Sequence, residues 1–186
     1  MRVLASRLLF LACSFPAIAQ PRVAIVLHDA AGLCRDLRIA MQNEASRVFR
    51  AAGVETDWRD SGAAASAGEV TLTLRLLPGY EIRDPLALGG ASLQGGYAQL
   101  YPETITTIAL SSGWTPAELM GHVAAHEIGH LLLGSSAHSN AGIMRPLWDA
   151  ATLRRLTHAG LVFLPDEARA LRIAATRALS SPRAAP

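Results

Sequence analysis

Apolar and polar residues follow two different spacings along the chain, and each spacing predicts one kind of element. Residues 70–76 alternate between polar and apolar side chains, as a strand with one buried face does, and the apolar run at 23–27 indicates another strand. Over residues 36–52 the apolar positions recur every three or four residues, which predicts an amphipathic helix that ends at Gly53. Residues 54–58 resume a strand-like pattern, so we expect two strands flanking a helix.

The second half of the chain predicts further strands and two more helices. The glycine-containing residues 84–96 indicate a loop or an irregular edge, followed by candidate strands at 96–101 and 104–110. Helical patterns follow at 115–133 and 165–179. This order, without an internal repeat, predicts one small α+β domain built on a mixed, twisted sheet.

The helix predicted at 115–133 has clear signals at both of its ends. Thr115 is a suitable N-cap, Pro116 fits the first helical position, and Glu118 completes a Thr-x-x-Glu capping box. Gly134 can adopt the left-handed conformation that commonly ends a helix. These signals predict a helix with well-defined ends.

This helix carries the sequence His-Glu-x-x-His at residues 126–130. Because successive helical residues are about 100° apart, His126 and His130 lie on one face with their Cβ atoms roughly 5–6 Å apart. Their imidazole nitrogens can then bind one zinc ion at about 2.0–2.1 Å. Glu127 lies beside that ion and can accept a proton from a zinc-bound water. The pattern predicts a zinc hydrolase, and the opposing interpretation is a helix whose histidines are merely hydrogen-bonded near the core.

The residues that follow this motif resemble those of metzincin zinc endopeptidases. In that family the His-Glu-x-x-His helix ends at a glycine, a third histidine follows, and a methionine-containing turn lies beneath the metal. The resemblance implies that His126, His130 and His138 are the zinc ligands, Glu127 the general base and Met144 the turn methionine. It also implies a zincin-like fold, and it covers roughly residues 22–148.

The spacing around Gly134 departs from the metzincin pattern, which has two residues in each gap. This chain has three residues between His130 and Gly134 and three more before His138. One added helical residue turns the exit direction by about 100° and advances it by ~1.5 Å, and the step from Gly134 to His138 can span up to ~13 Å. Closure is feasible, but Glu167 is an alternative third ligand, giving a two-His, one-Glu set as in thermolysin-like enzymes. The longer spacing indicates a divergent family, of secreted bacterial proteins.

Three other residues are candidates for a role in the site, and packing is the competing interpretation for each. His122 lies four residues before His126, but Val123 occupies the position of the base, which favours packing or support of the site. Tyr97 and Tyr101 are candidates for stabilising an oxyanion, with packing at the core or rim as the favoured interpretation.

Residues 1–19 resemble a bacterial export signal. Two arginines precede an apolar run, and an Ala-Ile-Ala sequence offers a cleavage site before Gln20. We therefore expect a zincin-like metallopeptidase domain at residues 20–186 that is secreted or periplasmic. The alternative is a lipoprotein anchored through Cys13.

Charge and cysteine content narrow the function classes. All 17 basic residues are arginine, and removal of the leader leaves 15 of them against 15 acidic residues. A neutral domain without a basic stripe argues against nucleic-acid binding. No apolar run after the leader approaches the ~20 residues of a permanent membrane span.

After removal of the leader, Cys34 is the one cysteine that remains, so no internal disulfide is expected. Cys34 is either a residue at a helix start or a metal-blocking thiol.

Together these features predict a secreted zinc metalloendopeptidase that acts on a peptide or protein substrate. Glu127 would activate the zinc-bound water, and an extended substrate would pair with an edge strand near residues 90–101. The alternatives are a zinc-dependent cell-wall amidase or other amide hydrolase, and a non-catalytic secreted zinc-binding protein. The sequence leaves the cleavage specificity and the oligomeric state open.

Overall fold

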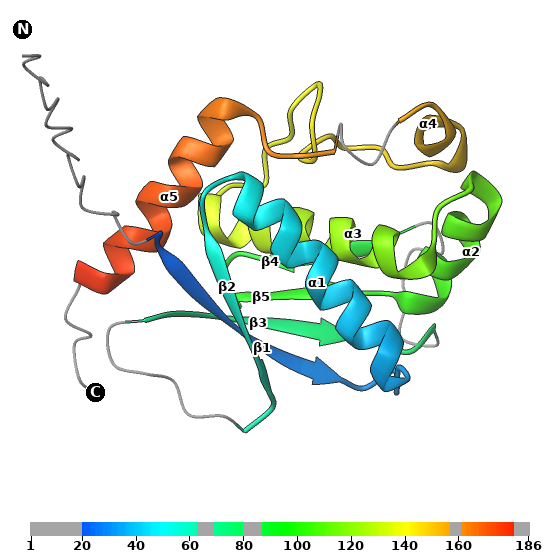
Figure 1. Cartoon of the computed structure of the whole chain (residues 1–186), viewed down its shortest axis with the longest axis horizontal. Coiled ribbons are helices and arrows are strands. Elements are labelled where there is room, and N and C mark those ends of the chain that lie inside the picture. The colour runs from blue at the N-terminus through cyan, green and yellow to red at the C-terminus, as the bar shows by residue number, and fades with distance from the viewer. Residues whose placement is uncertain (1–19, 63–68, 80–86, 157–160, 181–186) are drawn as a thin grey trace, which may run out of the picture.

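A mixed five-stranded sheet is the framework of the computed structural model, which describes residues 20–62, 69–79, 87–156 and 161–180 (Figure 1). The strands are β1 (Arg22–Asp29), β2 (Glu55–Asp60), β3 (Val70–Leu76), β4 (Gly89–Ser92) and β5 (Tyr97–Leu100). Their order across the sheet is β2-β1-β3-β5-β4, and all neighbours are parallel except β4, which runs antiparallel to β5. The sheet is therefore mixed, as predicted, and β4 is an edge strand.

The helices in the described part of the chain are α1 (Arg35–Ala51), α2 (Pro102–Ser112), α3 (Pro116–Leu133), α4 (Ala150–Arg155) and α5 (Pro165–Ser180). The long helices α1 and α3 pack against each other over the sheet, and α5 packs against α3 (Figure 1). None of the described helices is both long enough and apolar enough to cross a bilayer. The expected leader with Cys13, and His158, lie outside the described residues.

The core lies between the sheet and the helices α1 and α3. Four buried residues of α1 are spaced as one face of a helix requires, at Met41, Ala45, Val48 and Phe49. They meet core side chains of β1 and β3 that lie at every second position, because successive residues of a strand point to opposite faces; those of β1 are Val23, Ile25 and Leu27. The predicted helix at 36–52 and the predicted strands at 23–27 and 70–76 are confirmed.

The ends of α3 are formed as predicted. The backbone N–H of Glu118 donates to the Thr115 hydroxyl at 3.3 Å, and the Thr115 N–H donates to the Glu118 carboxylate at 3.0 Å. These two bonds form a capping box, with Pro116 in the first turn. Gly134 ends the helix at φ +61°, a conformation that a side chain would strain. The site helix therefore begins and ends at fixed residues.

The prediction of a strand at residues 104–110 is wrong, because this segment lies within helix α2. Its β-branched residues favour a strand, but Pro102 occupies a first-turn position and Gly113 ends the helix at φ +80°. The buried positions Pro102, Ile105, Ala109 and Ser112 have helical spacing. Packing of this face against α3 overrides the local preference for extended structure.

One short element was not predicted, and another was predicted only as a loop or irregular edge. Helix α4 begins at Asp149, whose carboxylate accepts from the Thr152 N–H at 2.6 Å, and α4 packs against α2. Strand β4 falls within the segment predicted as a loop or irregular edge, and the register pairs Ala91 with Ala98. Strand β4 and Asp149, the N-cap of α4, border the cleft described below.

Candidate metal centre

His126 and His130 lie one turn apart in the C-terminal half of α3, and both are buried. Their Nε2 atoms are 3.1 Å apart, and the two rings meet edge to face with centroids separated by 4.7 Å. The i, i+4 spacing on the helix brings the imidazoles together, as the sequence predicted. The rings therefore converge on one point and do not diverge into the core.

Backbone carbonyls fix the tautomer of both neutral rings. The Nδ1 atom of His126 lies 2.8 Å from the Ile143 carbonyl oxygen, and Nδ1 of His130 lies 2.7 Å from the Ser135 carbonyl oxygen. A carbonyl oxygen can only accept, so each Nδ1 carries the hydrogen. Each Nε2 then presents a lone pair, which is the arrangement of metal-ligating histidines in proteins.

The ring of His138 completes a group of three. It stacks on His126 at a centroid separation of 5.4 Å and meets His130 edge to face at 4.9 Å. One nitrogen from each ring lies within 4.8 Å of the other two. The loop beyond Gly134 therefore closes over the helix despite its longer spacing, and the exposed His138 joins the two buried histidines.

This donor set fits a divalent transition-metal ion. Two neutral imidazoles whose lone pairs face each other at 3.1 Å repel unless a cation or a proton lies between them. In a tetrahedral site with nitrogen ligands at about 2.0–2.1 Å, neighbouring nitrogens are roughly 3.3 Å apart. The spacing of the His126 and His130 nitrogens is close to that value, and imidazole suits zinc and its neighbours.

Burial keeps the imidazoles in the form that binds metal. Desolvation lowers the pKa of His126 to about 4 from its usual 6.5, and it also lowers the pKa of His130. The backbone bonds to Ile143 and Ser135 oppose these shifts, while the neighbouring histidines add to them. At neutral pH the rings are therefore uncharged, as ligation requires.

Glu127 points into the same space and lies against the edge strand. Its side chain is buried, and desolvation raises the pKa of its carboxyl to about 8. A Cβ at Gly89 of β4 would lie 3.0 Å from Cγ and 3.1 Å from Oε1 of Glu127, and 2.8 Å from the Gln99 carbonyl oxygen. The carboxylate therefore occupies room that Gly89 leaves open.

Met144 lies under the site helix, in the turn that follows His138. It is fully buried, and a Cβ at Gly129 would lie 3.0 Å from its sulfur atom. Gly129, next to His130, thus lets the turn approach α3 closely. The turn also supplies Ile143, whose carbonyl orients His126, so Met144 and the ligand helix are parts of one packed unit.

The three histidines and Glu127 lie on the wall of a cleft with a volume of about 620 Å³. One side of the cleft is formed by residues 87–91, which include part of the edge strand β4. The rest is largely apolar, with Ile108 from α2, Val123 from α3, and Leu147 and Trp148 from the loop before α4. The site is therefore open to a ligand along an edge strand.

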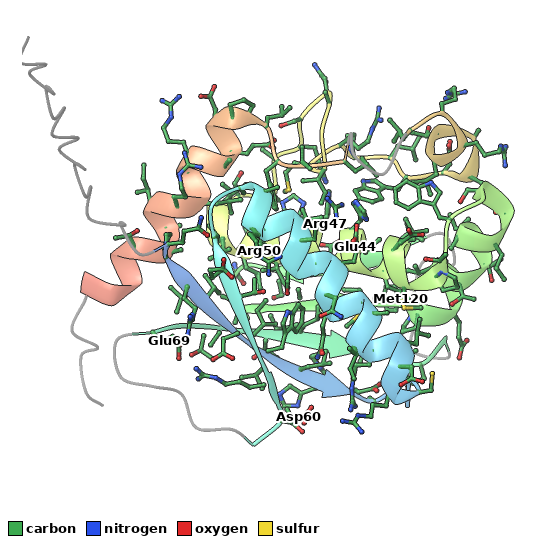
Figure 2. The ribbon with its side chains drawn as sticks, viewed as in Figure 1. Glu44, Arg47, Arg50, Asp60, Glu69 and Met120 are labelled. Atoms are coloured by element: carbon green, nitrogen blue, oxygen red, sulfur yellow. The ribbon has the colours of Figure 1, made fainter. Side chains whose placement is uncertain are left out.

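The other residues singled out in the sequence have different surroundings. The Nδ1 atom of His122 lies 2.8 Å from the Glu118 carbonyl oxygen, and its buried ring faces Glu44 and Arg47, which project from α1 toward α3 (Figure 2). The hydroxyl of Tyr101 accepts from the Gln99 amide at 2.6 Å. The favoured packing role of His122 agrees with these contacts.

Tyr97 and Tyr101 are not among the described residues that line the cleft, and Arg75 lies over the Tyr97 ring at 5.4 Å. Cys34, at the start of α1, is exposed and is likewise absent from that lining. Glu167, the alternative third ligand, accepts from the Ser139 hydroxyl and from the Leu164 N–H. Among the described histidine, cysteine, aspartate and glutamate side chains, the group that could hold a metal ion contains His138 and not Glu167.

Several residues of the site carry no sequence signal that would have identified them. Ser135 and Ile143 act through their backbone carbonyls, which any residue provides. The role of Gly89 can be recognised only in the structure, where β4 passes next to Glu127. Trp148 forms part of the cleft wall, and its ring meets His126 edge to face at 5.6 Å.

Comparison with known proteins gives a match in fold but none in sequence. No protein-family model and no curated protein matches the chain. A zinc-dependent peptidase from Methanocorpusculum labreanum matches with a TM-score of 0.55 and 18% sequence identity, over 79% of this chain and 99% of that chain. An archaemetzincin from Methanopyrus kandleri matches with a TM-score of 0.49 and 14% identity, over 89% of this chain and 99% of that chain. The chain therefore shares the α+β fold of the M. labreanum protein.

Proposed function

We propose that this chain is a zinc-dependent metalloendopeptidase that hydrolyses peptide bonds within extended polypeptides. The observation that carries the proposal is the convergence of His126, His130 and His138 within 4.8 Å, beside the buried carboxyl of Glu127. A solved structure with the same fold is that of a zinc-dependent peptidase, which supports the same chemistry here. Three nitrogen ligands leave a fourth position for water or substrate, as in catalytic zinc sites.

Zinc, when bound, supplies a water of lowered pKa and polarises the carbonyl that is attacked. Glu127 carries the proton in this mechanism. Its carboxylate accepts a proton from the attacking water and then donates that proton to the nitrogen of the leaving amine. Burial raises the pKa of Glu127 to about 8, and a nearby divalent cation opposes this shift by favouring the carboxylate. A bound divalent cation therefore favours the carboxylate form of Glu127, which is the form that accepts the proton.

The shape of the cleft favours an extended substrate. The free edge of β4 borders the cleft, so a peptide can add to the sheet as a further strand with its carbonyl near the histidines. The apolar walls at Ile108, Val123, Leu147 and Trp148 suit a large apolar side chain next to the cleaved bond.

The charges along the cleft favour cleavage within a chain over removal of a C-terminal residue. Glu127 and Asp149 are the charged side chains that line it, and no arginine lies among the described lining residues. Apart from the bound zinc, a terminal carboxylate would find no cationic partner among these residues and would face two carboxyl groups. An internal peptide bond carries no such charge.

The substitution Glu127→Gln tests the proposal. We expect the variant to bind zinc as tightly as the wild type and to lose at least a hundredfold in kcat on a peptide substrate, because the amide cannot carry the proton. Zinc content and hydrolysis of a quenched fluorescent peptide with a central apolar residue are the measurements. Full turnover with full zinc would overturn the role of Glu127.

The same assay separates the alternatives. Hydrolysis of cell-wall amides but not of peptides would identify an amide hydrolase with the same site. Zinc binding without turnover of either substrate would identify a binding protein.

We further propose that the protein is exported from a bacterial cytosol and cleaved before Gln20. The signal-like composition of residues 1–19 supports this proposal. Mass spectrometry of the protein expressed with its full N-terminus in a bacterial host tests it. We expect a mature chain beginning at Gln20 in the periplasm or medium, and an intact N-terminus in the cytosol would contradict export.

A further inference from the structure

His138 is held differently from the other two histidines of the centre. The rings of His126 and His130 each have a backbone carbonyl as a partner at Nδ1. Within the described residues, the ring of His138 contacts the other two rings and forms no hydrogen bond of its own. It is also exposed, so packing does little to restrict it. Its position must therefore be set by the backbone that carries it.

The next residue, Ser139, ties this backbone down at two points. Its N–H donates to the carbonyl oxygen of Met144 at 2.8 Å, which closes the loop on itself. Its hydroxyl donates to Oε1 of Glu167, which lies in the first turn of α5. Ser139 thus connects the loop that bears His138 to a helix that packs against α3.

Glu167 is itself fixed at the start of α5. Its Oε2 atom accepts the N–H of Leu164 at 2.7 Å, which is the bond that the third residue of a helix makes to its N-cap. One oxygen therefore caps the helix, and the other holds Ser139. Because a carboxylate accepts through both oxygens, Glu167 can do both at once.

We propose that Glu167 and Ser139 are positioning residues that hold His138 against the metal centre. On this account, Glu167 does not bind the metal. It holds the third ligand, His138, in place through Ser139. The inference rests on the proposed zinc site, although it does not require that the site be catalytic. It predicts that the affinity for zinc depends on a hydroxyl that touches neither the metal nor any imidazole.

The substitution Ser139→Ala tests this inference because it removes the link and leaves the cap of α5 in place. We expect zinc to bind about tenfold more weakly, in the range found when a partner that orients a ligand is removed. The Kd is measured by competition between the metal-free protein and a chromophoric chelator. Substitution with Co²⁺ gives a second readout, since the visible absorption of the variant should change as His138 leaves the ion in part of the molecules.

Two controls separate positioning from a general loss of structure. Asn140→Ala alters the exposed neighbour of Ser139 in the same loop, and Asp166→Asn removes a charge from the same turn of α5, at a side chain that is 90% exposed. Both should bind zinc within about twofold of the wild type. Thermal unfolding of the metal-free proteins checks that Ser139→Ala, which loses one hydrogen bond, is still folded at the temperature of the binding assay.

Zinc binding by Ser139→Ala within twofold of the wild type, with an unchanged Co²⁺ spectrum, would overturn the inference. Such a result would leave the proposed function intact. Conversely, a wild type that binds zinc but does not hydrolyse peptides would refute the proposed activity without affecting this test.

Discussion

Single residues of the site differ in how far the sequence reveals them. His126, Glu127 and His130 are identified by their spacing, because all three belong to one helix whose geometry is known in advance. Gly89 could not be identified in the same way, because its importance comes from Glu127, which approaches it from another element. Because glycine has no side chain, no sequence pattern shows that a position is needed for the space it leaves.

The substitution Gly89→Ala tests whether this space is needed. An added Cβ would meet the Gln99 carbonyl at 2.8 Å and Glu127 at 3.0–3.1 Å, so the paired backbones of β4 and β5 must shift and the Glu127 side chain must give way. Overpacking of this kind costs about 1–3 kcal/mol, which corresponds to a loss of roughly five- to 150-fold in kcat if the cost falls on the placement of Glu127. Zinc affinity should stay unchanged.

The matched control is Gly90→Ala, in the same strand. A Cβ there has its nearest neighbour, the Gln99 amide nitrogen, at 3.7 Å, so this variant should leave Glu127 in place and lose less kcat than Gly89→Ala, although Gly90 also lines the cleft. Equal activity of the two variants would show that Gly89 has no special role.

The buried ionisable groups predict how the metal-free protein responds to pH. The pKa of Glu127 is raised from 4.5 to about 8 by burial, so its contribution to the free energy of unfolding is lost as pH rises through this range. The pKa of His126 is lowered from 6.5 to about 4, so its contribution is lost as pH falls through that range. Of these two groups, Glu127 alone acts between pH 6.5 and 8.

We therefore expect the metal-free wild type to lose stability when the pH is raised from 6.5 to 8. The variant Glu127→Gln should lack this loss, because a glutamine has no proton to release. Urea denaturation at several pH values, with zinc removed by a chelator, provides the measurement. A loss of the same size in both proteins would contradict the assignment to Glu127.

At the scale of elements, capping residues and residue propensities predicted a helix or strand correctly where they agreed with its packing in the fold. Helix α3 has an N-cap, a capping box, a proline and a terminal glycine, and its predicted bounds are those observed. In α2 the β-branched residues opposed the helix, and the prediction of a strand failed although Pro102 and Gly113 marked the ends. Strand β4 is short and contains two glycines, so its pairing with β5, rather than any propensity, makes it a strand.

The cap of α3 should make a measurable contribution to stability. The substitution Thr115→Ala removes the acceptor for the Glu118 N–H, and we expect a loss of about 1 kcal/mol in the free energy of unfolding. Thr115→Ser keeps the oxygen and should recover most of that loss. Urea denaturation of the three proteins decides the matter, and an equal loss in the alanine and serine variants would exclude the cap as the cause.

At the scale of the whole molecule, the sequence predicted the fold class but not the arrangement that makes the cleft. The α+β class follows from the order of the helices and strands, whereas the sheet order β2-β1-β3-β5-β4 depends on contacts between distant segments. The closure of the loop at His138 likewise depends on α5, through Glu167 and Ser139. The arrangement of His126 and His130 on their helix was therefore predictable from the sequence. His138, in the loop, was predicted only through the resemblance to metzincins.

The central claim is that His126, His130 and His138 together hold one zinc ion. The most direct test is the zinc affinity of the metal-free wild type, of His138→Ala and of His28→Ala, measured by competition with a chelator. His28 is exposed near the end of β1 and serves as the control. We predict one zinc per chain for the wild type and for His28→Ala, and a Kd more than about 100-fold higher for His138→Ala, beyond the cost of losing a partner that only orients a ligand. Binding of zinc by His138→Ala as tight as that of the wild type would contradict the account.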